Sequence, residues 1–383
     1  MFVIVFLLAL SILVIIHEFG HYFAARFFGV KAEEFGFGFP PRLIGFVKDR
    51  KRWKIVGPRD DTKYANTVWS LNWLPLGGFV RIKGEHEDGI HDFDSIHSKP
   101  IWQRIIIIAA GVFMNWIFAI LLFATVFLFG TVAILEDLPA GAAISNRSVM
   151  VMDVLPGSPA ARAGLHDGDG IVTIEGISPH SAREARDTIR ARGLRETSIV
   201  FEREGEKHAV LATPELLSAT KRIGIGVALE DVGTVSFPFA DAVVNAVRTT
   251  ILLTKTIVVA FALVLRDLFF GKVASDVSGP VGIAVMANRI AKQGMMPFLQ
   301  FAALLSVNLA VINFLPIPAL DGGRVLFLAL EKLRRRPMSR HLEIGIHNIA
   351  FIILILIILL VTARDLTRYG GTIVGGVRGA IGL

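Results

Sequence analysis

Four clusters of apolar residues, each long enough to cross a lipid bilayer, limit what this chain can fold into. They cover residues 1–28, 105–135, 297–318 and 344–361. A helix rises about 1.5 Å per residue, so about 20 apolar residues span the hydrocarbon core. The composition agrees, because 53% of the residues are hydrophobic and only 19% are charged, against about 25% charged in soluble proteins. The sequence therefore predicts a polytopic α-helical membrane protein.

The distribution of positive charge predicts the orientation of the chain. No Lys or Arg precedes Arg26, so the first cluster lacks the basic start of a signal peptide and is interpreted as a transmembrane helix. Basic residues gather at 31–54 and at 324–340. Cytoplasmic loops carry such an excess, so both segments are expected inside and both termini outside. The net charge of +7 then reports orientation. Nucleic-acid binding is excluded, because it would not explain the apolar excess.

Residues 249–265 form a further apolar stretch with two interpretations. Hydropathy alone would make it a span, but the basic cluster 334–336 would then lie outside, against the positive-inside rule. The stretch also contains Lys255, and Arg248 precedes it at helical spacing with Asp241. We therefore interpret it as an amphipathic helix that lies on the outer membrane face or against the protein, and we expect about four spans.

The segments between the spans differ in composition. Residues 137–236 combine interspersed charges, Gly-Asp turns and short alternating strands, which is typical of a small soluble domain. Residues 29–103 carry strand-like pieces and a Gly77-Gly78 turn, which predicts a β-rich, membrane-associated cytoplasmic loop. The remaining predicted segments are helix 1 at 1–28, helix 2 at 104–136, an amphipathic helix and connection at 237–295, helix 3 at 296–322, a basic loop at 323–343, helix 4 at 344–363 and a Gly-rich tail without a clear fold at 364–383.

The strongest local signal is His17-Glu18-Phe19-Gly20-His21. Positions i and i+4 of a helix share a face, so two imidazoles there can bind one Zn²⁺, with Glu18 beside them as a general base. The alternative is a pair of buried histidines satisfied by hydrogen bonds. Ionisable side chains inside a membrane helix are costly, and this favours the metal site.

Two histidines leave such a site short of a ligand, because catalytic zinc usually has three protein ligands. The chain has no cysteine. Asp321 is the candidate, since it follows a membrane helix interrupted by Pro316 and Pro318. Irregular backbone at membrane depth is tolerated only where it is buried in protein or lines a cavity, so this segment is predicted to belong to the site. The alternative role for Asp321 is a helix N-cap.

These motifs resemble the site-2 protease family of intramembrane zinc metalloproteases, and the resemblance covers nearly the whole chain. The segment 17–21 is similar to the family's HExxH and 313–322 to its NxxPxPxLDG. Shorter similarities lie at 35–40, 75–80, 278–282 and 111–115, where Val112 replaces the usual proline.

The resemblance implies one Zn²⁺ per chain, held by His17, His21 and Asp321, with Glu18 as the catalytic base. The matched motifs also supply candidate substrate-binding residues, which are Asn313, Pro316, Pro318, Asn115, Gly77 and Gly78.

Residues 154–171 resemble a PDZ domain of the protease-associated kind, whose loop amides can take a peptide end. An inert β-rich spacer is the alternative. The predicted fold class is therefore a polytopic α-helical membrane protein with about four transmembrane helices, membrane-associated β-structure and one inserted PDZ-like domain of α+β or β-rich type.

The resemblance further implies regulated intramembrane proteolysis of single-span membrane proteins, of the anti-sigma-factor kind. The chain would lie in the bacterial inner membrane with the PDZ-like domain in the periplasm. A membrane scaffold with a structural zinc site is the main alternative, and Glu18 argues against it, since a structural site has no use for a free carboxylate. His86, His91 and His97 lie in an acidic loop that we interpret as solvated rather than as a second metal site.

Overall fold

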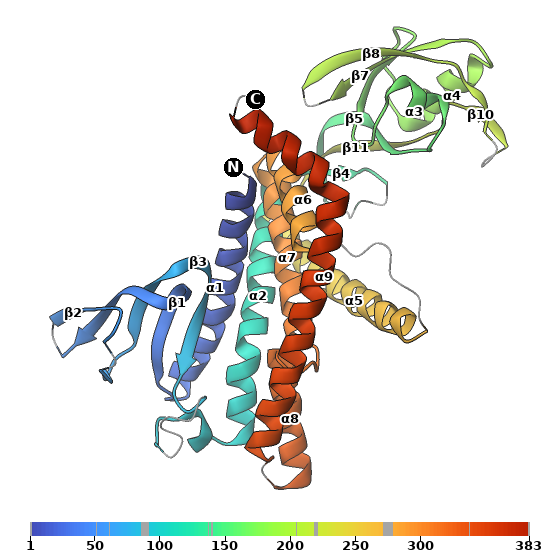
Figure 1. Cartoon of the computed structure of the whole chain (residues 1–383). Helices are drawn as coiled ribbons and strands as arrows, with labels where there is room; N and C mark the ends of the chain where they lie inside the picture. Colours follow the sequence, from blue (N-terminus) through green and yellow to red (C-terminus); the bar gives the residue numbers. More distant parts are fainter. Residues whose placement is uncertain are drawn as a thin grey trace. The chain divides into compact units, whose positions relative to one another are not determined.

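A computed structural model of the chain describes residues 2–50, 52–60, 62–85, 92–136, 138, 141–203, 205–217, 221–270, 279–336 and 338–381. The chain divides into two compact units, one of Met1–Phe123, Val247–Gly294 and Phe298–Leu383 and the other of Ala124–Ala246 and Met295–Pro297. Figure 1 shows the elements of both units in chain order. His86, His91 and Ser278, which the sequence analysis considered, lie outside the described residues.

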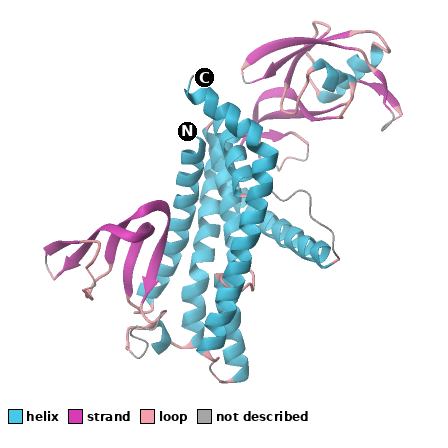
Figure 2. Ribbon diagram, in the orientation of Figure 1, coloured by secondary structure: helices cyan, strands magenta, loops and turns pink. Residues whose placement is uncertain are grey.

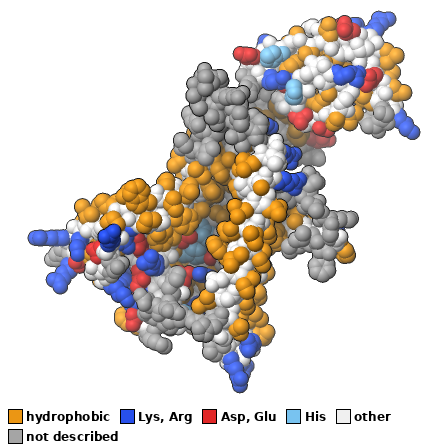
Figure 3. All heavy atoms as spheres, in the orientation of Figure 1, with side chains coloured by type: hydrophobic (Ala, Val, Ile, Leu, Met, Phe, Trp, Pro, Cys, Tyr) orange, Lys and Arg blue, Asp and Glu red, His pale blue; other side chains and the backbone are white. Residues whose placement is uncertain are grey.

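Long apolar helices dominate the first unit, and Figure 3 shows hydrophobic side chains covering much of their exposed surface. In the described part of the chain, five helices are long and apolar enough to cross a membrane. This supports the prediction of a membrane protein. The helices that lie wholly or mainly in this unit are α1 (Phe2–Phe27), α2 (Ile101–Phe129, which ends in the second unit), α5 (Phe239–Phe269, which begins in the second unit), α6 (Pro280–Lys292), α7 (Met295–Phe314, whose first three residues belong to the second unit), α8 (Asp321–Arg334) and α9 (Arg340–Ile381).

The helices differ from the predicted segments in several places. Most of the predicted basic loop 323–343 is helical, because α8 runs through Arg334 and α9 begins at Arg340. Helix α2 ends at Phe129, because Gly130 takes a left-handed φ of 99°, and Thr131–Ile134 then form strand β4. Helix α5 is longer than the predicted stretch 249–265, and its apolar window is long enough to span. Its placement on the membrane surface stays a prediction. Helix α9 continues to Ile381, through residues for which no fold was predicted.

Small residues and one buried acid hold the helices of the first unit together. A Cβ on Gly20 of α1 would collide with the backbone of Ala110 in α2, so the two helices approach closely there. The buried carboxylate of Asp365 on α9 accepts a hydrogen bond of 2.7 Å from the Gly282 amide in the first turn of α6. It serves that helix as a cap from another element, since α6 has no side-chain cap of its own.

A three-stranded antiparallel sheet lies against α1 and has the order β2-β1-β3 (Figure 2). Its strands are β1 (Ala32–Asp49), β2 (Arg52–Val56) and β3 (Val68–Ile82), and the 3₁₀ turn η1 (Ile96–Ser98) follows. Residues 34–37 of β1 pair with residues 78–81 of β3 and also with residues 68–71 of the same strand. Residues 78–82 therefore form an edge of the sheet, which confirms the β-structure expected in this loop.

The edge of the sheet is fastened to α1 by hydrogen bonds to side chains. The Gly77 amide donates to Ser11 Oγ at 3.0 Å, and the Val80 amide donates to Glu18 Oε2 at 3.0 Å. A Cβ on Gly78 would press on Ile15 of α1. These contacts bring the edge strand beside the His17–His21 segment.

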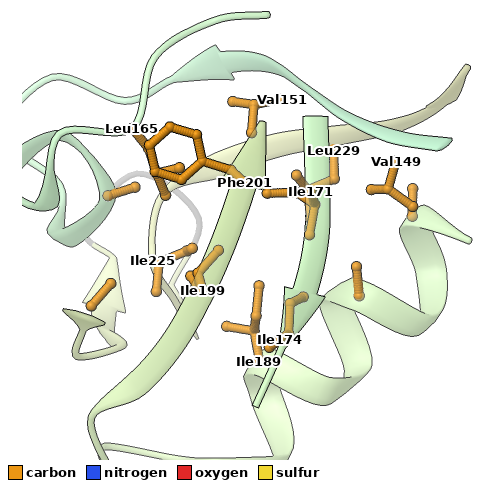
Figure 4. Close-up of a cluster of buried hydrophobic side chains, with 14 residues drawn as sticks. Val149, Val151, Leu165, Ile171, Ile174, Ile189, Ile199, Phe201, Ile225 and Leu229 are labelled. Carbon is orange, nitrogen blue, oxygen red and sulfur yellow. The ribbon is translucent and has the colours of Figure 1, made fainter. Parts of the chain in front are cut away.

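The second unit has the mixed α and β content predicted for residues 137–236. Its six-stranded sheet has the order β4-β11-β5-β6-β7-β8. Inward-facing Val151, Ile199, Phe201 and Leu229 pack with α4 residues in one core (Figure 4). Beyond β4, the elements are β5 (Ala143–Val154), α3 (Pro159–Ala163), β6 (Gly170–Ile174), α4 (Ala182–Ala191), β7 (Thr197–Arg203), β8 (Glu206–Ala212), β9 (Glu215–Leu217), β10 (Arg222–Gly224) and β11 (Val227–Ser236).

The sheet of the first unit contains a buried ion pair with a predictable pH dependence. Arg42 donates two hydrogen bonds to the Glu34 carboxylate, at 2.9 and 2.6 Å. Burial raises the pKa of Glu34, but the hydrogen bonds from Arg42 and its positive charge outweigh it, so this pKa lies below its ordinary value. A carboxyl with a lowered folded pKa stabilises the fold above its unfolded pKa, and this contribution is lost as the pH falls through the folded pKa.

We expect Glu34→Gln to lower the free energy of unfolding at pH 7 by about 1–3 kcal/mol, because the charged hydrogen bonds from Arg42 to the buried Glu34 carboxylate are lost. The loss should shrink as the pH falls below the ordinary pKa of Glu. Thermal unfolding of the detergent-purified protein, followed by tryptophan fluorescence from pH 7 to pH 3, measures both effects. A loss that is equal at all pH values would contradict the ionic role.

Candidate metal centre

His17 and His21 project from the same face of α1, as their i, i+4 spacing requires. Both side chains are buried, and their Nε2 atoms lie 3.1 Å apart. At this distance, both Nε2 atoms are close enough to bind the same metal ion. The helix therefore presents the histidines as the sequence predicts.

Asp321 completes the cluster from a distant part of the chain. Its Oδ2 lies 2.9 Å from His17 Nε2 and 3.4 Å from His21 Nε2. Helix α7 ends at Phe314, and the turn before α8 includes Ala319 with a left-handed φ of 79°. Leu320 is the N-cap of α8, and Asp321 is the first helical residue. Asp321 is therefore turned to the histidines, and the alternative role as an N-cap does not hold.

The three side chains fit a zinc ion by their chemistry. Among the described residues, His17, His21 and Asp321 place one possible ligand atom each within 4.8 Å of one another. Imidazole nitrogen and carboxylate oxygen are ordinary zinc ligands. His21 Nδ1 lies 2.9 Å from the Ile107 carbonyl oxygen, which can only accept, so this nitrogen carries the proton. When the His21 ring is neutral, Nε2 is therefore unprotonated and faces the cluster, as zinc binding requires.

Glu18 lies beside this cluster without being one of the three candidate ligands. Its Oε2 accepts the hydrogen bond from the Val80 amide at 3.0 Å, so the edge strand β3 holds the carboxylate in place. A cavity of about 680 Å³ is lined by His17, Glu18, His21 and Asp321 together with Phe79, Val80 and Ile82 of β3. The hollow beside the sheet is visible in Figure 3. A carboxylate next to a candidate metal site in a cavity is placed to move protons.

The candidate substrate-binding residues differ in how close they lie to the His17–His21–Asp321 cluster. The Asn313 amide nitrogen lies 3.5 Å from His17 Nε2, at the limit of a hydrogen bond. Pro316 and Pro318 lie in the turn between α7 and α8 and are not among the described residues that line the cavity. Gly77 and Gly78 pack against α1, as described above.

Asn115 is fully buried, and its side chain lies against His17. It is not among the described residues that line the cavity.

Three features of the site were not predicted from the sequence. A Cβ on Gly111 would overlap the imidazole rings of His17 and His21, so only glycine fits beneath them. His347 of α9 accepts a hydrogen bond of 2.8 Å from the Ala319 amide and so supports the turn that presents Asp321. Arg324 of α8 forms an ion pair with Glu85. The glycine of the 111–115 motif was a signal for the first; spacing along the chain carries no signal for the other two.

Comparisons with known proteins agree with this geometry. The family model of peptidase family M50 matches residues 5–57 and 61–357. A protein of Clostridium perfringens named "Putative zinc metalloprotease" is 30% identical over 96% of this chain and 98% of its own length. The zinc metalloprotease RasP of Bacillus licheniformis is 29% identical over 96% of this chain and 99% of its own.

Part of this chain is similar in sequence to a solved PDZ domain. The PDZ domain of the SdrC-like protein of Listeria monocytogenes is 26% identical and covers 23% of this chain and 92% of that chain, with a TM-score of 0.21.

We expect Gly111→Ala to lower zinc affinity by about 10- to 100-fold, the range found when residues that orient metal ligands are changed. The added methyl group would push the two imidazoles apart. Competition with a chromophoric chelator, on the full chain purified in detergent, measures the affinity. Gly57→Ala is the matched control, because a Cβ at Gly57 meets nothing within 4 Å. Equal zinc affinity in both variants would show that the close approach is not needed.

Proposed function

The chain belongs to peptidase family M50, the site-2 protease family, and on that basis we propose that it cleaves single-span membrane proteins within their transmembrane segments. As a member of this family it is a zinc metalloendopeptidase and a membrane protein. One observation carries the proposal. His17, His21, Asp321 and Glu18 meet in one cavity within a unit built mainly from apolar helices.

We propose that His17, His21 and Asp321 hold one Zn²⁺ per chain and that Glu18 is the catalytic base. Bound there, zinc supplies Lewis acidity and lowers the pKa of water. Glu18 takes a proton from the attacking water and passes it to the leaving amine. Asn313, beside His17, is a candidate to hold the substrate backbone, and Pro316 and Pro318 shape the turn that presents Asp321.

The edge strand of β3 is the proposed binding site for the unwound substrate. A transmembrane helix keeps its amides in internal hydrogen bonds, so cleavage requires local unwinding. An unwound segment can add to a sheet edge by backbone hydrogen bonds, and residues 78–82 form such an edge beside Glu18. Pairing with the substrate would take the Val80 amide away from Glu18 and free the carboxylate for proton transfer. Gly77 and Gly78 would allow the close approach of a second backbone.

We further propose a bacterial inner-membrane location with the PDZ-like domain in the periplasm. The basic residues at 31–54 and 324–340 support this orientation. The substrates would be of the anti-sigma-factor kind, in regulated intramembrane proteolysis. The PDZ-like domain would bind a peptide end or limit which substrates reach the site.

We expect Glu18→Gln to keep zinc and to lower the rate of cleavage by about 10²- to 10⁴-fold, since it removes proton transfer and no ligand. Asp321→Ala should lose both zinc and activity. Metal analysis and cleavage of a model transmembrane substrate by the detergent-purified protein measure the two properties separately. Glu206→Gln, an exposed change on β8, is the control. If Glu18→Gln cleaves like the wild type, the chain is not a protease of this mechanism, and the scaffold with a structural zinc site is favoured.

The edge-strand binding site predicts a pattern of crosslinks. The chain has no cysteine, so each introduced cysteine is unique. In an inactive Glu18→Gln background, Phe79→Cys should crosslink to cysteines placed in the substrate transmembrane segment. Ile55→Cys, on β2 at the opposite edge of the sheet, should not. Disulfide products separated on gels measure the yield, and equal yields at both positions would exclude β3 as the specific site.

A further inference from the structure

Asn115 lies in contact with the metal cluster but not in the cavity. It is 0% exposed. Its Nδ2 lies 3.3 Å from Nδ1 of His17, the ring nitrogen that does not face Asp321. Its Oδ1 is also buried and has no hydrogen-bond partner in the described part of the chain. The oxygen and nitrogen of an amide are nearly the same size, so this side chain can present either atom to the ring in the same space.

The two orientations of this amide have opposite consequences for His17. If Nδ2 faces the ring, it donates to an unprotonated Nδ1, and the neutral imidazole carries its proton on Nε2. That proton would then occupy the side that faces Asp321 and His21. If the amide turns by half a rotation, Oδ1 accepts from a protonated Nδ1 instead. The second orientation satisfies the orphaned oxygen and leaves the Nε2 lone pair free for a metal.

The position of Asn115 is set from a third helix. Ser306 of α7, which is fully buried, donates a hydrogen bond of 2.8 Å from its Oγ to the backbone oxygen of Asn115. The contact joins α2 to α7 at Asn115, whose side chain touches the ring of His17 on α1. Packing and the hydrogen bond from Ser306 to the Asn115 backbone thus hold the side-chain amide beside the ring.

Helix α2 places one polar group beside the Nδ1 atom of each histidine. It offers the backbone carbonyl of Ile107 to Nδ1 of His21 and the side chain of Asn115 to Nδ1 of His17. A backbone carbonyl is present whatever the residue, whereas the second acceptor depends on the side chain at position 115.

We propose that Asn115 is a positioning residue for the zinc ligand His17: its Oδ1 accepts the Nδ1 proton and so turns the Nε2 lone pair to the metal. It acts through His17 and does not touch the substrate, in contrast to the substrate-binding role that the sequence motif suggested. This inference rests on the proposed zinc site at His17, His21 and Asp321.

Zinc affinity of the full chain in detergent, measured by chelator competition, tests the inference. Asn115→Leu, which has a similar size but no acceptor, should bind zinc about 10- to 100-fold more weakly. Asn115→Asp, which keeps an acceptor, should bind close to the wild type. The visible spectrum of the Co²⁺-substituted protein gives a second readout, since it reports the ligand arrangement and should change in Asn115→Leu alone.

Asn72→Leu is the matched control, because Asn72 is also buried and its Oδ1 also lacks a partner among the described residues. It should leave zinc affinity unchanged. Equal affinity in wild type and a folded Asn115→Leu would overturn the inference, as would equal loss in the Leu and Asp variants, which would mean that packing alone matters. His17→Ala tests the proposed zinc site separately from the role of Asn115. If it still binds zinc like the wild type, the proposed zinc site itself is wrong.

Discussion

The burial of ionisable side chains among apolar helices is the constraint on which the rest of this structure depends. His17, Glu18 and His21 lie in a helix that is otherwise nearly all hydrocarbon. A polar or charged group in such surroundings costs several kcal/mol unless it has a partner. Each of the three has one: Asp321 and Asn115 lie at His17, the Ile107 carbonyl at His21 and the Val80 amide at Glu18. The neighbouring elements can be understood as suppliers of these partners.

Two features of the backbone allow these partners to reach the histidines: a close approach of two helices and a break between two others. Gly20 and Gly111 let α1 and α2 approach so closely that side chains and carbonyls of α2 touch the imidazole rings. The chain between α7 and α8 leaves the helical conformation, and the turn at Ala319 directs the Asp321 carboxylate to the histidines. A membrane protein accepts such a break where the turn is held by other groups, here by His347.

The β-sheet adds a function that helices cannot provide. Helices satisfy their backbone groups internally, whereas a sheet edge leaves amides and carbonyls for another strand. The edge at residues 78–82 lies beside Glu18, so the proposed binding edge and the proposed catalytic base share one hydrogen bond, from the Val80 amide. Substrate capture and the release of the base are linked by that bond in the proposed mechanism.

The sequence by itself determined the membrane character, because several apolar clusters of this length are stable only in a bilayer. It also determined that His17 and His21 lie on one face of a helix with Glu18 beside them, because helical spacing is a local property. It pointed to Asp321 through two helix-breaking prolines, and family resemblance strengthened the assignment. Only the tertiary structure decided what surrounds them: that Gly111 lies beneath the histidines and that Asn115 faces His17 rather than the cavity. These contacts join residues about 90 to 300 positions apart, as in the His17–Asn115 and His17–Asp321 pairs. Local periodicity in the sequence cannot predict contacts between residues so far apart in the chain, since these contacts depend on how closely whole helices pack.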